Sequence, residues 1–225
     1  MPVHDPSSAL RPLPGPSRAQ RLKTGTDHAH RRLDQRILDL DIFRSRAAYA
    51  CFLRVQHRLH ADVHGLYACP ALVQLLPSIQ GRQRLSRVAC DLADLDAHLP
   101  DPAPCAPDIG TPSHGLGWLY VMEGSALGGA VLLKLASQPG LHANFGARHM
   151  APAPEGVAAA WRRFVAELDA IVLDPQQEAA VLQGAGAAFA RAAHHLDAEL
   201  GWGRVQQFPL RAGSSPVRVH ACAKL

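Results

Sequence analysis

The chain has 225 residues and a formal net charge of +4, and 48% of its residues are hydrophobic while 19% are charged. This length and composition are typical of one folded domain with a sizeable core, and the 5% aromatic content beside abundant Ala and Leu favours packed helices over a β-sandwich. Lys and Arg form no stripe interleaved with aromatic residues, so the mild positive charge does not indicate a nucleic-acid-binding protein.

Apolar periodicity and helix-breaking residues predict one all-α domain over residues 17–203. Residues 1–16 are rich in proline and have few groups to bury, so they are predicted to be a disordered tail. Residues 204–225 are predicted to be a flexible C-terminal tail. Residues 100–113 contain several prolines and are predicted to be a loop. The helices are predicted at 17–38, 46–66, one or two within 70–99, 115–137, 155–173 and 175–202.

The first predicted helix carries two histidines, of which only one can face the core. At about 100° per residue, His30 shares a face with Thr26, whereas His28 lies about 200° away. A neutral imidazole on an apolar helix face is a suitable axial ligand for haem iron. Asp34 lies one turn later and can orient the ring, and Lys23 lies about 10 Å earlier, within reach of a haem propionate. The alternative is a partly buried surface histidine with no ligand role, which is the more common state for one of 13 histidines.

The predicted helix at 115–137 is almost entirely apolar but contains five glycines. Each glycine costs a helix about 0.5–1 kcal/mol relative to alanine, so something should offset that cost. Gly117, Gly124 and Gly128 form one bare stripe, which lets a flat ligand approach the backbone. Close packing against another soluble helix explains the stripe equally well. A membrane-spanning helix is less favoured, because Glu123 lies near its middle.

Taken together, these two segments resemble the haem oxygenase family, and more closely its bacterial branch. The pattern LKxxTxxxHxxLD at residues 22–34 resembles the proximal helix of the family, and YVMEGSALGG at residues 120–129 resembles the distal helix. The two motifs occur in this order and nearly a hundred residues apart. The resemblance covers roughly residues 17–200 and implies a single-domain, all-α fold with haem held between the two helices.

The resemblance also implies roles for particular residues. His30 is the implied iron ligand, supported by Asp34. The implied catalytic residues are His30, Gly124, Ser125 and Gly128. The implied haem-binding residues are Lys23, Thr26, Asp34, Tyr120, Gly129 and Phe189. Ser125 differs from the carboxylate that animal members carry there, and a hydroxyl is a weaker organiser of a distal water molecule.

By the same resemblance, haem is both substrate and cofactor and is cleaved with O2 and electrons to biliverdin, CO and Fe2+. The sequence contains no Rossmann or flavin motif, so an external ferredoxin, flavodoxin or reductase is expected to donate the electrons. Supply of biliverdin to a bacteriophytochrome and iron acquisition both stay open. Two alternatives remain: a haem-binding or haem-sequestering protein on the same fold that does not turn haem over, and a helical interaction protein without haem.

The sequence also bears on the compartment. Five cysteines without a CxxC spacing indicate neither a disulfide framework nor a zinc ribbon, and the N-terminus has no apolar signal region. We therefore expect a cytoplasmic protein without a membrane partner. Nothing in the sequence requires more than a monomer.

Overall fold

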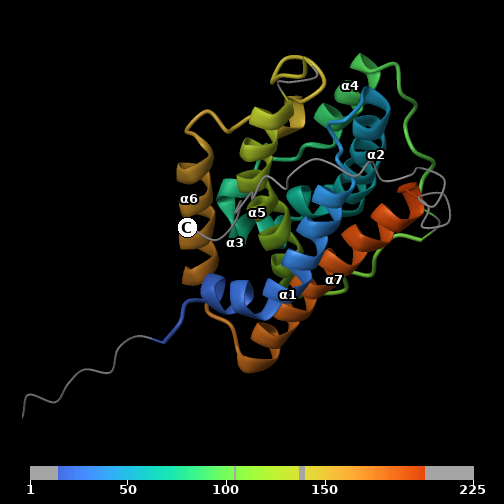
Figure 1. The fold of residues 1–225 in the computed structure, drawn as a ribbon. Helices are drawn as coiled ribbons and strands as arrows, with labels where there is room; N and C mark the ends of the chain where they lie inside the picture. The colour runs from blue at the N-terminus through green and yellow to red at the C-terminus, as the bar shows by residue number, and fades with distance from the viewer. Residues whose placement is uncertain (1–14, 104, 137–139, 201–225) are drawn as a thin grey trace, which may run out of the picture.

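The computed structural model describes residues 15–103, 105–136 and 140–200, which fold into a helical assembly without β-strands among those residues (Figure 1). This confirms the all-α prediction. The predicted C-terminal tail and all but the last two residues of the predicted N-terminal tail lie outside the described residues. The α-helices are α1 (Arg18–Asp39), α2 (Arg46–Val63), α3 (Pro70–Leu75), α4 (Leu85–Asp94), α5 (Pro112–Ala136), α6 (Val157–Ala170) and α7 (Pro175–Leu200). The short 3-10 helices are η1 (His64–Ala68), η2 (Pro77–Ile79) and η3 (Arg148–Met150).

Local signals set the ends of these helices. Ser17 caps α1, with its hydroxyl accepting from the backbone of Gln20 while the Gln20 side chain accepts from the backbone of Ser17. Asp174 likewise accepts from the backbone N–H of Gln177 at the start of α7. The predicted second helix is shorter than expected, because η1 follows it from His64 onward. The observed ends otherwise lie within a few residues of the predicted ones.

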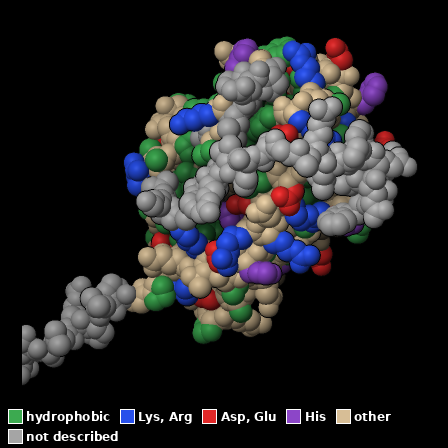
Figure 2. Space-filling model, in the orientation of Figure 1, with side chains coloured by type: hydrophobic (Ala, Val, Ile, Leu, Met, Phe, Trp, Pro, Cys, Tyr) green, Lys and Arg blue, Asp and Glu red, His purple; other side chains and the backbone are tan. Residues whose placement is uncertain are grey.

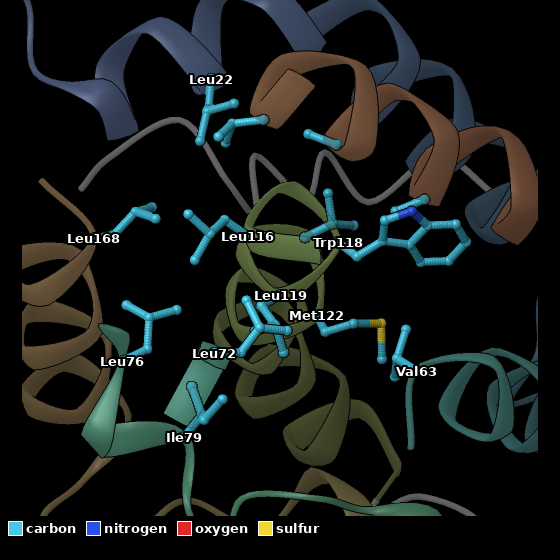
Figure 3. Packing of buried hydrophobic residues seen from close by; sticks show 14 of the residues in the cluster. Leu22, Val63, Leu72, Leu76, Ile79, Leu116, Trp118, Leu119, Met122 and Leu168 are labelled. Atoms are coloured by element: carbon cyan, nitrogen blue, oxygen red, sulfur yellow. The ribbon is translucent and has the colours of Figure 1, made fainter. Parts of the chain in front are cut away.

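Helix α5 lies at the centre of the core. Figure 3 shows Leu116, Leu119 and Met122 of α5 among buried side chains from the surrounding elements, and all three are almost fully buried. Helix α7 packs along α5, and α6 lies on another side of it. A core position explains why α5 is hydrophobic around so much of its circumference.

The stretch Pro112–Lys134 is long and apolar enough to cross a membrane by length and composition alone. In the fold it is the central helix against which the others pack, which accounts for the same composition. Lys and Arg side chains appear at several separate places on the face drawn in Figure 2, interspersed with acidic and apolar groups.

Two buried polar clusters hold α7 against its neighbours. Asp62 of α2 accepts from both Arg191 (2.7 Å to Nε) and His195 (2.6 Å to Nε2) of α7. At the start of α1, the buried Arg18 forms a 2.8 Å ion pair with Glu178 of α7. These contacts, in addition to apolar packing, position α7 against the helix that carries His30.

Candidate active site

His30 lies on α1 with its ring edge-on to Phe189 of α7, the ring centroids being 5.6 Å apart. Its side chain is 33% exposed, whereas His28 is fully on the exposed face. The Nδ1 atom of His30 is 3.4 Å from a carboxylate oxygen of Asp34, an ion-pair distance that is longer than a good hydrogen bond. Burial raises the pKa of Asp34, and the neighbouring His30 opposes part of that rise. The ring is therefore oriented from two sides and still partly accessible.

Three further predicted haem-binding residues lie along α1 or beside it. Thr26 is buried, and its hydroxyl donates to the carbonyl of Leu22 one turn earlier (2.8 Å). Lys23 is exposed on the same helix. Tyr120 of α5 is half-buried, and its hydroxyl lies 3.4 Å from the carbonyl oxygen of Ala19, one turn before Lys23. The structure thus brings Tyr120 to the part of α1 that carries Lys23.

The glycines of α5 have different surroundings although they share one sequence motif. A Cβ at Gly128 would meet no atom within 4 Å, so this point of the helix faces open space. A Cβ at Gly124 would come within 3.6 Å of the Trp161 ring of α6, an ordinary van der Waals contact. A Cβ at Gly129 would lie 3.8 Å from Met150. Gly129 is buried on the side of α5 about 140° from Gly124, so it packs against η3 and does not share the face of Gly128.

Gly117 settles the question that the sequence left open about the glycine stripe. A Cβ at Gly117 would overlap the backbone of α7 at Val181 and Ala185, and a Cβ at Gly184 of α7 would overlap the carbonyl of His114. Helix packing therefore explains Gly117, while the open space at Gly128 fits the approach of a ligand. Each of the two explanations holds at a different glycine.

Ser125 is exposed on α5, and its hydroxyl donates to the carbonyl oxygen of Met122 at 2.7 Å. The hydroxyl hydrogen is therefore used within the helix, while the oxygen lone pairs can still accept from a water molecule. Ser125 can thus help to position a distal water but, in this rotamer, cannot donate a hydrogen bond to a bound ligand.

These residues fit a haem molecule. A partly accessible imidazole with Asp34 at its Nδ1 has its Nε2 atom on the side away from Asp34, which is the arrangement that orients histidine ligands in many metal sites. The open space beside Gly128 is where any larger side chain would obstruct a flat ligand. Among the residues that the structure describes, no group of three or more His, Cys, Asp or Glu side chains could hold a metal ion.

Sequence reasoning did not identify a buried polar cluster behind α5. Glu123 is 8% exposed and accepts from the hydroxyl of Tyr67 (2.9 Å) and from Arg82 (3.1 Å). Burial and the nearby Glu123 raise the pKa of Tyr67 well above its usual range. The sequence offered one indication of this cluster, the glutamate within an apolar helix, because a buried carboxylate needs hydrogen-bond or ion-pair partners. Its partners lie 41 and 56 residues away, so only the fold reveals them.

A second buried group lies close to η3. Asp91 is fully buried and accepts from the backbone N–H and from the Nδ1 atom of His149, at 2.9 and 2.7 Å. Burial lowers the pKa of His149, and the hydrogen bond to Asp91 opposes that shift. Burial also lowers the pKa of His60 to about 3, aided by the positive charge of His149 and Arg84. His60 Nδ1 has no hydrogen-bond partner among the described residues.

The helical fold, with a partly accessible histidine on α1 and a glycine-bearing central helix α5, is compatible with a haem-binding helical enzyme, and comparison with known proteins supports this class. The haem oxygenase fold of Neisseria meningitidis, solved with NO and CO bound, superposes with a TM-score of 0.79 at 34% identity, covering 82% of this chain and 92% of that one. The haem oxygenase structure from Leptospira interrogans superposes with a TM-score of 0.69 at 16% identity, covering 81% of this chain and 100% of that one, and supports the fold alone.

The sequence comparisons give the family. The model of the family described as "Heme oxygenase" matches residues 17–197. The protein named heme oxygenase PigA from Pseudomonas aeruginosa is 39% identical over 176 residues, which is 77% of this chain and 88% of that protein. A heme oxygenase from Xanthomonas campestris is 34% identical over 149 residues, 63% of this chain and 84% of that protein. The chain belongs to the haem oxygenase family, and the prediction of a haem oxygenase of bacterial type is confirmed.

Proposed function

We propose that this protein cleaves haem with O2 and externally supplied electrons, giving biliverdin, CO and Fe2+. One observation carries the proposal beyond the family assignment. The imidazole of His30 is partly accessible and is oriented by Asp34 and Phe189. In the same fold, helix α5 has open space beside its backbone at Gly128. One element supplies an iron ligand, and the other leaves room for the second face of a planar substrate.

His30 is proposed to hold the iron through Nε2, while Asp34 restrains the ring through Nδ1. Bound haem supplies the oxygen chemistry and is itself the molecule oxidised, so the protein contributes orientation and access. Phe189, 8% exposed, closes one side of the imidazole and limits rotation of the ring. His30 would thus hold the iron, and bound haem would supply the site of oxygen chemistry.

Lys23 and Tyr120 are proposed to hold the haem propionates. The Tyr120 hydroxyl is 3.4 Å from the Ala19 carbonyl, and Tyr120 packs at a 5.6 Å centroid distance against Trp161. This packing limits the positions that the phenol can adopt. An ammonium and a phenolic O–H donor on neighbouring turns suit the carboxylate of a propionate. Thr26 is proposed to act through packing, since its hydroxyl is bonded within α1.

On the distal side, Gly124 and Gly128 are proposed to let the macrocycle approach α5, and the Ser125 oxygen to accept from an ordered water. Gly129 was predicted to line the same wall. Its contact with Met150 supports a different role, as the packing residue that seats α5 on η3. The hydroxyl of Ser125 bonded to Met122 also keeps the non-catalytic haem-binding alternative open.

An external ferredoxin, flavodoxin or reductase remains the proposed electron donor, because the sequence carries no flavin- or nicotinamide-binding motif of its own. Supply of biliverdin to a bacteriophytochrome and release of iron for nutrition are both consistent with this chemistry. The proposed location is the cytoplasm, where such donors occur, and the proposed state is a monomer.

The test is a titration of the purified protein with hemin, followed by ascorbate, or ferredoxin with its reductase, in air. Loss of the Soret band with growth of a broad red band is expected, and His30→Ala should abolish turnover unless imidazole is added. A Soret band that persists under reductant and O2 would transfer the protein to the haem-sequestering class. Full turnover by His30→Ala without imidazole would refute the ligand assignment.

A further inference from the structure

A separate cavity of about 360 Å³ lies between η2, α5 and α6. None of its lining residues belongs to α1 or α7, the helices that carry His30 and Phe189. On α5 it is lined by Glu123 and Ala126, which lie about 140° and 160° around the helix from Gly128. The cavity therefore lies on another side of α5 from Gly128, although Trp161, which lines it, also packs against Tyr120 and lies beside Gly124.

The wall of this cavity carries an excess of positive charge. It contains four guanidinium groups and two carboxylates: Arg82, Arg84, Arg87, Arg163, Glu123 and Glu155. The carboxylates are shared, since Arg82 lies 3.1 Å from Glu123 and 3.8 Å from Glu155, and Arg163 also lies 3.8 Å from Glu155. Arg84 donates to the carbonyl oxygen of His149 at 2.9 Å, a neutral acceptor. The cations are thus only partly compensated.

Burial makes this imbalance costly. The side chain of Arg82 is 13% exposed. Burial lowers the pKa of Arg84, Glu123 and Tyr67 oppose that shift, and the neighbouring Arg87 and Arg82 add to it. Arg87 and Arg163 are exposed at the rim of the cavity, so the cost of burial falls on Arg82 and Arg84. A buried cation loses part of its hydration, and a bound anion offsets that loss. Ser78 also lines the cavity, and its hydroxyl oxygen is buried without a hydrogen-bond partner among the described residues.

We propose that this arginine-lined cavity binds a small multivalent oxyanion, either a di- or tricarboxylate or a phosphate. Guanidinium groups recognise both kinds of oxyanion through paired N–H donors, and the volume lies within the range of small-molecule sites. Arg82 would contact the oxyanion while it also pairs with Glu123, the residue before Gly124. The cavity is thereby connected to the helix that faces the haem.

The test uses the full-length, haem-free protein titrated with citrate and, separately, with pyrophosphate at constant ionic strength. Trp161 lines the cavity, so its fluorescence should change in a saturable way, and sodium chloride at equal ionic strength should leave it unchanged. Saturation by only one of the two probes identifies the ligand as a carboxylate or a phosphate. In Trp161→Phe the fluorescence change should disappear, while calorimetry still detects binding.

Variants locate the site. Arg87→Ala and Arg163→Ala should each weaken binding about tenfold, because each removes a charge-assisted hydrogen bond. Arg162→Ala is the matched control, since Arg162 is exposed on the same helix as Arg163 but does not line the cavity. Absence of saturation, or equal loss in Arg162→Ala and Arg163→Ala, would overturn the proposal. Hemin binding is measured in parallel, so that failure of the haem function is seen separately from failure of this site.

Discussion

Gly117 of α5 and Gly184 of α7 form a reciprocal contact in which each glycine lies against the backbone of the other helix. A side-chain carbon at Gly117 would overlap the carbonyl of Val181, and one at Gly184 would overlap the carbonyl of His114. This contact brings the two backbones close enough for α7 to present Phe189 to His30. The glycine stripe therefore contributes to the candidate site partly through the packing of α5 on α7.

Replacing either glycine should destabilise the fold. Gly117→Ala and Gly184→Ala are each expected to cost about 3 kcal/mol, because the added carbon meets backbone that cannot rotate away. Gly186→Ala is the matched control on α7, since a Cβ there meets no atom within 4 Å and alanine favours a helix. Urea unfolding monitored by circular dichroism measures all three. Equal stability of Gly184→Ala and Gly186→Ala would contradict the contact.

The sequence was informative where the determinants are local. The helix ends follow from capping residues such as Ser17 and Asp174, and the assignment of His30 rather than His28 to the inner face follows from helical periodicity. The stripe of glycines was not informative in the same way. Gly117 and Gly128 belong to the same stripe in the sequence, but only Gly117 packs against another helix. It packs there because α7 carries Gly184, which lies 67 positions later in the chain.

Buried polar partners were beyond the reach of the sequence for a related reason. Glu123 was noticed as a charge in an apolar helix, yet its partners Tyr67 and Arg82 come from other elements. Periodicity describes the face on which a residue lies but not which element will cover that face. The arginine-lined cavity likewise joins segments that are separate in the chain.

Asp34 provides a test of how His30 is oriented. Asp34→Asn keeps the size of the side chain but removes the negative charge 3.4 Å from Nδ1 of His30. Loss of such an outer partner typically costs 10- to 100-fold in metal affinity or activity, and because this contact is long we expect about tenfold slower turnover of haem. Turnover is measured by the loss of the Soret band under reductant. Arg31→Gln, which breaks the exposed ion pair with Asp27 on the same helix, should leave the rate unchanged.

A substitution at Gly128 should change the affinity for hemin with little change in the stability of the fold. In Gly128→Leu the new side chain extends into open space, so the free energy of unfolding should change by no more than about 1 kcal/mol. The same side chain obstructs the proposed approach of haem to α5, and hemin affinity should fall at least about tenfold. Gly186→Leu, in open space on α7, is the control that should retain affinity. Unchanged hemin binding by Gly128→Leu would place the haem elsewhere.

The buried histidines predict that the fold loses stability in acid. Burial lowers the pKa of His60 to about 3, so the folded protein keeps this ring neutral while the unfolded chain binds a proton near pH 6.5. The unfolded state therefore binds more protons below that pH, and stability should fall as the pH decreases from about 6.5 toward 3. The contribution of His60 approaches about 1.4 kcal/mol per pH unit within that window.

His60→Leu isolates this contribution. The substitution leaves an apolar side chain at a position that is 5% exposed and whose Nδ1 atom has no hydrogen-bond partner among the described residues. The free energy of unfolding, measured in urea at pH 7, 6 and 5, should decrease less steeply with acidity in this variant than in the natural protein. His28→Leu, at an exposed position, should preserve the original slope. Identical slopes for His60→Leu and the natural protein would show that the protonation of His60 does not control acid stability.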